Sequence, residues 1–228
     1  MAEEVKRKKK NLHEEAGGEE AEPWLLTYGD MMTLLMTFFV LLFSMSTIDP
    51  VKLEQFGDSV GEALGKKTKV KKYSLAEIYK DVVQVIEDEN LQDQIRVETS
   101  ERGVAIKIPS EISFGIGSAD LNPRIYTILN KFEDMMMKST YPIAIEGHTD
   151  NVPMRSAMFP SNWELSTSRA AQVVRYYIVR GVSPERFQAI GYADTRPRAP
   201  GATIKEANSS SDRMAMNRRV EIFFLTIQ

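Results

Sequence analysis

The chain has 228 residues, a formal net charge of −3 at pH 7 and no cysteine. Its length is sufficient for one membrane-spanning segment and one domain of about 150 residues with a core of its own. The small net charge argues against a nucleic-acid partner, and the absence of cysteine excludes disulfides and thiolate metal sites. The two histidines, His13 and His148, lie far apart in the sequence, so we expect neither a zinc site built from this chain alone nor a bound cofactor.

The first segment, residues 1–23, carries a basic run at positions 6–10 and an acidic run between positions 14 and 22, without an apolar period. This composition predicts a disordered tail. Basic residues beside a membrane helix stay in the cytoplasm. We therefore expect the tail to be cytoplasmic and the carboxyl-terminal bulk of the chain to be exported.

Residues 24–45, WLLTYGDMMTLLMTFFVLLFSM, predict a helix that crosses a membrane. At about 1.5 Å per residue the segment reaches roughly 33 Å, and the hydrocarbon core of a bilayer is about 30 Å thick. A cleaved signal peptide is the alternative, but the run is too long for one and lacks a small-x-small cleavage pattern. The sequence therefore predicts a single-pass membrane protein with an exported carboxyl-terminal domain.

One ionisable residue, Asp30, lies inside this segment. A carboxylate within a bilayer costs a few kcal/mol at least, so Asp30 is expected to be functional and to face a polar pathway and not lipid. Thr33 and Thr37 fall on the same helical face and are expected to support that pathway. In the alternative interpretation, the hydroxyls only bond the carbonyl one turn back, and Asp30 stays protonated against a partner helix.

Residues 46–65 predict a second, weaker helix with Asp49 as its N-cap and Pro50 at the first helical position. Gly57 and Gly61 each weaken a helix by about 1 kcal/mol relative to alanine, so this helix needs a surface to lie against. We expect it to act as a removable plug over the outer mouth of the pathway; an ordinary linker helix is the alternative. The apolar residues of the expected plug are Val51, Leu53, Phe56, Val60 and Leu64.

Residues 66–93 begin with the basic connector KKTKVKK at positions 66–72 and continue as an amphipathic helix over residues 74–90. Ser74 followed by Glu77 is the pattern of a capping box. We interpret the whole segment as a linker that ends in a helix.

Residues 94–228 are expected to form the exported domain. The apolar period is two between residues 95 and 108, around a turn at residues 100–103, which indicates an antiparallel hairpin. The other expected elements are helices at 124–138 and 162–180 and strands at 141–146, 187–191 and 219–227. Strands separated by helices in this way predict an α+β sandwich with the helices on one face of the sheet.

Polar residues gather at the predicted ends of these elements. Residues 147–151, GHTDN, follow a strand, and Asn162, Ser166 and Arg169 lie at the start of a helix. An aspartate can hold an ammonium group and an arginine can clamp a carboxylate, so the set suits a small zwitterion. A structural salt bridge between Asp150 and Arg169 is equally consistent with the residues. No Ser-His-Asp spacing is present, so an enzyme is not expected.

Four motifs occur in order and resemble the OmpA-like peptidoglycan-binding family over residues 95 to 228: GHTDN, NWELSTSRAAQV, GYAD and MNRRVEI. The resemblance implies that Asp150 binds the amine and Arg169 the carboxylate of a diaminopimelate group in the wall peptide. It also implies pocket roles for Thr149, Asn162, Leu165 and Ser166. The chain departs from the family pattern in the insertion 152–161 and in Tyr177, where leucine is usual.

The basic tail, the segment PWLLTYGDMMTLLMTFFVLLFS and the amphipathic segment after it resemble the MotB family of flagellar motor stator subunits. The resemblance implies that Asp30 carries the coupling ion and that residues 49–64 form a plug. It also implies a homodimer inside a ring of multi-pass MotA-type subunits, which connect it to the flagellar rotor.

Sodium is the favoured coupling ion, because TLLMTFFVLLFS is similar to the sodium-type relatives and Thr33 and Thr37 add oxygen ligands. A proton, which needs only the carboxylate, is the alternative. Two other classes of protein remain open. The first is a passive wall anchor, which would not need Asp30. The second is an energy transducer similar to ExbD or TolR, whose exported domains lack the HTDN and NRR motifs.

Overall fold

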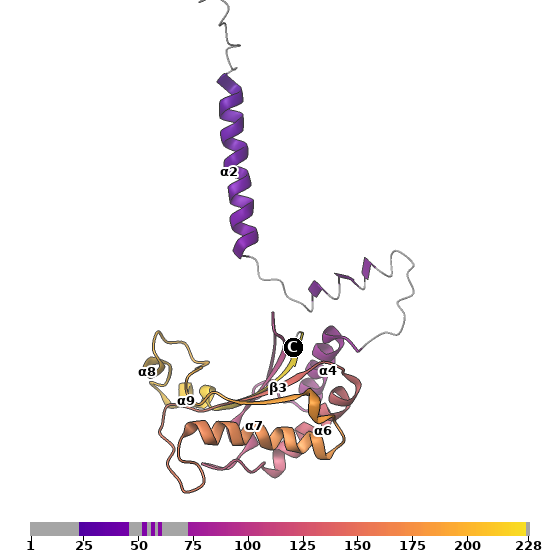
Figure 1. Ribbon diagram of the computed structural model, residues 1–228, viewed down its shortest axis with the longest axis vertical. Helices are drawn as coiled ribbons and strands as arrows, with labels where there is room; N and C mark the ends of the chain where they lie inside the picture. The colour runs from indigo at the N-terminus through magenta and orange to yellow at the C-terminus, as the bar shows by residue number, and fades with distance from the viewer. Residues whose placement is uncertain (1–22, 46–51, 54–55, 58, 61–72, 227–228) are drawn as a thin grey trace, which may run out of the picture. The chain divides into compact units, whose positions relative to one another are not determined.

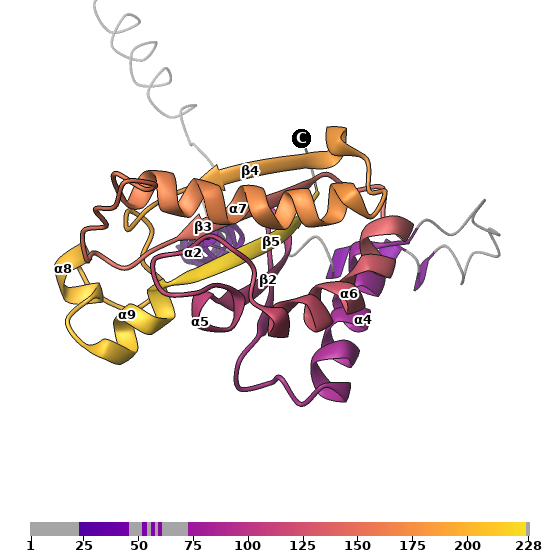
Figure 2. The same cartoon turned by 90° about the horizontal axis from the view of Figure 1, so that it is seen from below.

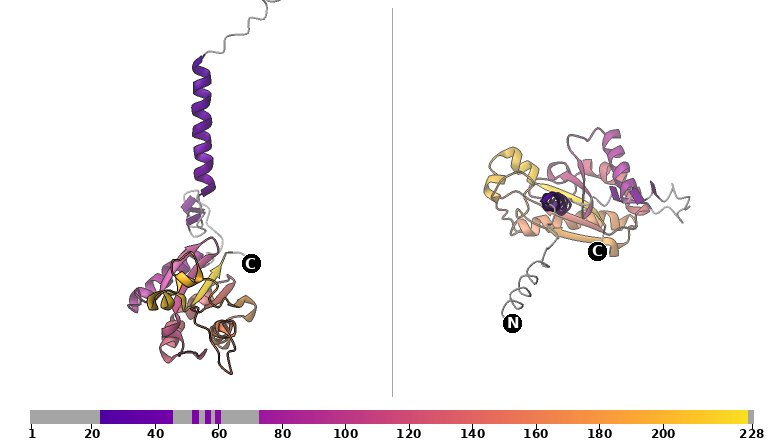
Figure 3. Two further views of the ribbon diagram at one scale, coloured as in Figure 1. Left: turned by 90° about the vertical axis from the view of Figure 1, so that its left-hand side faces the viewer. Right: turned by 90° about the horizontal axis from the view of Figure 1, so that it is seen from above.

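The computed structural model describes residues 23–45, 52–53, 56–57, 59–60 and 73–226 (Figure 1). The chain divides into two compact units, residues 1–47 and residues 48–228. In the first unit, α2 (Pro23–Met45) is one unbroken helix (Figure 3). Residues Trp24–Met45 are long and apolar enough to cross a membrane, and their side chains are exposed on every face of the helix. This pattern fits the predicted membrane span, because an isolated helix apolar on all faces requires a nonaqueous surrounding.

The predicted plug lies mostly outside the described residues. Of its apolar side chains, Leu53, Phe56 and Val60 are described; they are helical and exposed. Val51 and Leu64 lie outside the described part of the chain. The plug therefore stays a prediction.

The second unit is built on a five-stranded sheet with the strand order β1-β2-β5-β3-β4. The hairpin expected near residues 95–108 is present, as β1 (Arg96–Ser100) and β2 (Gly103–Pro109). β5 (Arg219–Leu225) lies antiparallel between β2 and β3 (Ile143–His148), and β4 (Phe187–Gly191) runs parallel to β3. The sheet is therefore mixed, with β1 and β4 at its edges.

Three long helices cover one face of this sheet (Figure 2). They are α4 (Leu75–Asp88), α6 (Pro123–Lys138) and α7 (Asn162–Val179). The predicted capping box of Ser74 and Glu77 starts α4. Within residues 73–226, four short helices lie in the connections: α5 (Ser110–Ser113), η1 (Pro184–Arg186), α8 (Ile204–Ala207) and α9 (Ser211–Asn217). The predicted α+β sandwich is confirmed. Because α4 contributes four buried side chains to the core, it packs as part of the domain and not as part of a linker.

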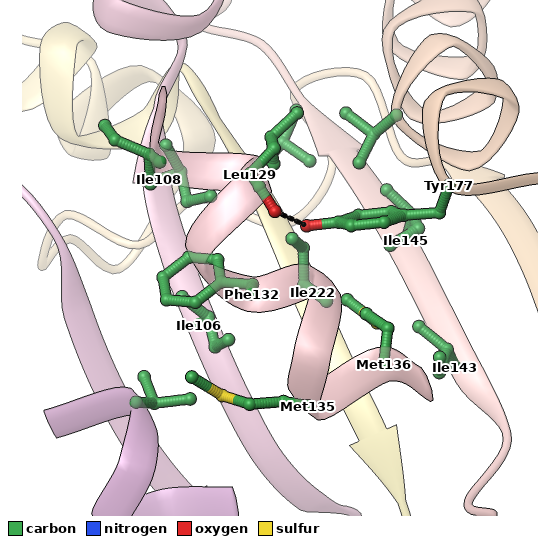
Figure 4. Packing of buried hydrophobic residues seen from close by; sticks show 14 of the residues in the cluster. Ile106, Ile108, Leu129, Phe132, Met135, Met136, Ile143, Ile145, Tyr177 and Ile222 are labelled. Carbon is green, nitrogen blue, oxygen red and sulfur yellow. Dashed lines mark hydrogen bonds between the residues drawn. The ribbon is translucent and has the colours of Figure 1, made fainter. Parts of the chain in front are cut away.

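The core lies between the sheet and the three helices, where alternate strand residues point inward (Figure 4). Ile106, Ile145 and Ile222 come from three neighbouring strands and are fully buried. Tyr177, at the position where the resemblance expects leucine, is also fully buried, and its hydroxyl donates to the carbonyl oxygen of Leu129 at 3.2 Å. A buried tyrosine is tolerated here because its polar atom has a partner.

Two strands differ from the expectation. β5 ends at Leu225, before the predicted end at residue 227. β3 begins and ends two residues later than the predicted strand 141–146, so Gly147 and His148 lie in the strand and not in the loop after it. The reason is pairing on both sides: Gly147 faces Val220 of β5 and Gly191 of β4, and His148 faces Arg219. Neighbouring strands thus extend the ladder into a segment that its own residues mark as a loop.

Gly147 is required by the contact between β3 and α7. A Cβ atom at this position would lie 2.1 Å from the carbonyl oxygen of Ser166 in α7. We expect Gly147→Ala to lower the free energy of unfolding by about 1–3 kcal/mol or more, as overpacked sites do, because backbone must move. Chemical denaturation would measure the loss. Gly115→Ala is the control, since its Cβ would make an ordinary 3.6 Å contact; equal stability of the two variants would contradict the expectation.

Candidate functional site

Asp150 lies just beyond the end of β3 and is buried, with 8% of its surface exposed. Its Oδ2 accepts a hydrogen bond from Nη1 of Arg218 at 2.8 Å, and its Oδ1 accepts one from the backbone N–H of Val152 at 3.1 Å. The ion pair of Asp150 is therefore with Arg218. The alternative of a structural salt bridge between Asp150 and Arg169 is not what the structure shows, because Arg169 bonds to main-chain carbonyls instead.

Arg169 is a buried cation on the inward face of α7, with 5% of its surface exposed. Its Nε donates to the carbonyl oxygen of Ser118 at 2.9 Å and its Nη2 to that of Gly115 at 3.4 Å, while its guanidinium carbon lies 5.1 Å from the ring centre of Phe114. Within the described residues, no carboxylate forms an ion pair with it. Guanidinium has five N–H donors, so several stay available for a ligand.

The electrostatics of the pocket follow from this arrangement. Burial, together with the nearby charge of Arg218, lowers the pKa of Arg169 to about 10 in spite of Asp150. Arg169 is therefore still charged at neutral pH, with its charge incompletely compensated. Burial alone would lower the pKa of Arg218, but its hydrogen bonds to Asp150 and Glu111 raise it. The pocket thus combines one paired cation, one carboxylate and one cation that can accept an anionic group.

Arg218 belongs to the motif MNRRVEI, but the sequence alone assigned it no role in the site. It links Asp150 to Glu111 and lies directly before β5. The signal was present in the strand order: because β3 and β5 are antiparallel and His148 faces Arg219, the residues just after β3 and just before β5 meet. Knowing that these strands are neighbours would have identified it.

The other predicted pocket residues hold the pocket loops in place. Asn162 donates to the carbonyl oxygens of Asp150 at 3.3 Å and Val152 at 3.0 Å, and its Oδ1 accepts from the N–H of Met154 at 3.2 Å. Leu165 packs with Phe159 in a small apolar cluster. Both contacts fix the inserted loop 152–161 beside Asp150, so these side chains act by positioning.

Thr149 and Ser166 connect the pocket to the loop after β4. The N–H of Thr149 donates to the carbonyl oxygen of Ala193 at 2.8 Å, and the N–H of Ala193 donates to Oγ of Ser166 at 3.1 Å. Ala193 adopts a positive φ of 48°, an uncommon backbone conformation for alanine that these two bonds hold. Three of the four sequence motifs therefore meet at one point of the fold.

In α2, the hydroxyls near Asp30 bond back to the helix. Thr33 donates to the carbonyl oxygen of Asp30 at 2.9 Å and Thr37 to that of Leu34 at 2.8 Å. This is the geometry of the alternative interpretation given above. It uses only the hydroxyl hydrogens, so the oxygen lone pairs of both threonines remain as acceptors.

Two family models match the chain. Residues 6–64 match the family described as "Membrane MotB of proton-channel complex MotA/MotB", and residues 113–211 match the OmpA family. The first match includes the membrane helix and the predicted plug. The second includes Asp150, Arg169 and most of the positioning residues.

The chain is also similar to whole proteins. It is 33% identical to the Bacillus subtilis (strain 168) protein YtxE over 90% of this chain and 88% of that protein. It is 27% identical to Motility protein B of the same strain over 96% and 95% of the two chains. Among solved structures, a periplasmic domain of Helicobacter pylori MotB is 29% identical with a TM-score of 0.52, covering 59% of this chain and 83% of that one. The cell wall anchor of the T6SS from Pseudomonas aeruginosa is 28% identical with a TM-score of 0.56, covering 68% and 99%.

Asn162 offers a direct test of the positioning role. We expect Asn162→Ala to lower the free energy of unfolding by about 1–3 kcal/mol, because carbonyl and N–H groups beside Asp150 lose their partner. The N–H of Met154 should also exchange with solvent faster, which hydrogen exchange would measure. Asn122→Ala is the control, since Asn122 is a helix N-cap without a side-chain cap bond. Unchanged exchange at Met154 would show that Asn162 does not hold the loop.

The likeness to MotB proteins extends over both units of the chain and over nearly the full length of the relatives. It agrees with the apolar amino-terminal helix and with the fold of the exported unit. The chain therefore belongs to the MotB family, whose members are stator subunits anchored to the cell wall and not enzymes.

Proposed function

We propose that this stator subunit carries its coupling ion on Asp30 and binds peptidoglycan through Asp150, Arg169 and Arg218. The observation that supports the wall site most directly is the buried charge of Arg169, which has no carboxylate partner among the described residues, close to the carboxylate of Asp150. Removing a charge from water without a partner is costly, so such a site favours an anionic group from outside.

The ligand best suited to this pocket is the zwitterionic end of a diaminopimelate residue. Its carboxylate would pair with Arg169, and its ammonium would bind Asp150 in competition with Arg218, whose bond to Asp150 is 2.8 Å long. Arg218 thus holds Asp150 in a binding orientation before the ligand arrives. Because the loop 152–161 is fixed by Asn162, the pocket is largely preformed.

The ion-carrying role rests on Asp30. A charged carboxylate in a site of low dielectric is unfavourable, and a bound cation or proton relieves that cost. An ion that crosses 100 mV supplies about 2.3 kcal/mol per unit charge. We propose that the alternation between the neutral and charged states of Asp30 changes how a surrounding ring of MotA-type subunits packs around two copies of α2. The wall site would hold this assembly against the reaction torque.

The amino terminus is proposed to be cytoplasmic and the second unit periplasmic, with the helix in the inner membrane. Sodium is the proposed coupling ion, supported by the free lone pairs of Thr33 and Thr37 near Asp30. A proton is the second candidate, because the family model that matches residues 6–64 is described for a proton-channel complex.

The wall site predicts a charge-dependent loss of binding. Asp150→Asn and Arg169→Gln are each expected to weaken binding of the exported unit to purified diaminopimelate-type peptidoglycan at least tenfold, since losing one partner of a buried charge pair costs about 2–5 kcal/mol. Sedimentation with wall fragments would measure it. Asp212→Asn and Arg175→Gln, which alter exposed residues on α9 and α7, should bind normally. If all four variants bind alike, the proposed pocket is wrong.

The ion pathway predicts an Asp30-dependent flux. In cells that express the chain with its channel partner and with residues 50–64 deleted, Asp30→Asn should abolish cation entry, because the amide cannot take up or release a charge. Sodium uptake and internal acidification would be recorded in parallel. Uptake of sodium would support a sodium stator, and acidification alone would indicate that the coupling ion is the proton. Flux of neither ion in a correctly assembled complex would leave only the anchoring role. Asp30→Glu, which keeps a carboxylate, is the matched variant.

A further inference from the structure

Three potential metal ligands meet on the face of the sheet opposite α4, α6 and α7. They are Glu146 and His148 of β3 and Glu221 of β5, which are 2%, 2% and 4% exposed. Glu146 and Glu221 are direct partners in the ladder, and His148 lies two residues further on the same face. One ligand atom from each of the three lies within 4.8 Å of the others.

His148 is the unexplained member of this cluster. Among the described residues, neither of its ring nitrogens has a hydrogen-bond partner, although both are buried. Its Nε2 lies 3.9 Å from Oε2 of Glu146 and 3.9 Å from Oε1 of Glu221, which is too far for hydrogen bonds. Each nitrogen of an imidazole is a hydrogen-bond donor or acceptor, so a buried imidazole needs a partner for both nitrogens. The imidazole therefore faces two carboxylates without a hydrogen bond to either.

The groups around the cluster hold the potential ligands in position. Arg102 pairs with Oε1 of Glu146, and Arg219 pairs with Oε1 of Glu221. The ring of Tyr192 stacks on His148 with a centroid distance of 5.4 Å. Metals bind the neutral form of imidazole, which has a free nitrogen lone pair. Hydrogen-bonded carboxylates are typical of metal sites.

The donor atoms of the cluster favour one kind of cation. Ca²⁺ and Mg²⁺ are bound by six or more oxygens, whereas this cluster offers one imidazole nitrogen and two carboxylates. Zn²⁺ binds imidazole nitrogen and carboxylate oxygen together, and three protein ligands with one water complete its tetrahedral shell. We propose that Glu146, His148 and Glu221 form a zinc site, separate from the wall pocket and from the ion pathway.

This proposal differs from our expectation that the chain has no zinc site. That expectation counted histidines and cysteines, whereas in the proposed site two glutamates would supply the other ligands. His148, the last residue of β3, lies two residues before Asp150, and Arg219, the first residue of β5, directly follows Arg218. Zinc would therefore join the ends of the two strands that carry the wall pocket.

The test uses residues 48–228, a compact unit with its own core in which His148 is the only histidine. Its imidazole ¹⁵N resonances are therefore unambiguous. Zinc chloride should shift the Nε2 resonance of His148, bind with one equivalent per chain by elemental analysis, and raise the melting temperature, with chelator reversing all three effects. A His148 spectrum unchanged at excess zinc would overturn the proposal and indicate a bridging water instead.

A matched pair of variants tests the ligand set. Glu221→Gln keeps the size of the side chain and is expected to weaken zinc binding at least about tenfold. Glu185→Gln, at an exposed position, should bind zinc as the parent does. Amide spectra would establish that both variants fold. Equal zinc affinity of the two folded variants would show that the ion binds elsewhere.

Discussion

The antiparallel pairing of β3 with β5 determines where the functional side chains of the exported unit lie. Its register places Glu146 opposite Glu221 and His148 opposite Arg219. Because strand side chains alternate, the residues between them point into the core, and the ionisable ones share the other face. Beyond the last pair, the same register brings Asp150 to Arg218. A slip by one residue would turn the charged groups toward the core, so the fold and the pocket depend on one register.

Helix α7 adds the second half of the pocket through contacts that only glycine permits. A Cβ atom at Gly147 would meet the backbone of Ser166, and one at Gly191 would lie 2.1 Å from Oγ1 of Thr167. The absence of both side chains lets α7 lie directly on β3 and β4. Arg169, one turn further along α7, is thereby brought to the end of β3, near Asp150. Motifs that are far apart in the sequence are thus brought together by the same close packing of backbone around the charged pocket.

Much of this architecture could be predicted from local sequence. The length of the apolar run predicted α2, the apolar period predicted α4 and α6, and the alternation before residue 108 predicted the first hairpin. A helix was also expected where α7 lies. The end of β3 could not be predicted, because its last residues pair through neighbouring strands although GHTDN has the composition of a loop. Arg218 and the cluster around His148 were missed for the same reason, since both depend on which strands are adjacent. The resemblance identified Asp150 and Arg169, but the residues alone left a salt bridge between them equally possible.

The two units share an electrostatic feature that connects them to one function. In α2, no cation pairs with Asp30 among the described residues, and in the exported unit no carboxylate pairs with the buried Arg169. A folded chain normally pairs or neutralises such groups, because an uncompensated charge away from water is unfavourable. In the proposed function, each of these groups binds a charged species from outside. The ion proposed at Asp30 would also have to leave, which requires weak, reversible neutralisation. The wall peptide proposed at Arg169 would have to stay bound under load, which is favoured by the bonds of Asn162 that hold the loop beside Asp150.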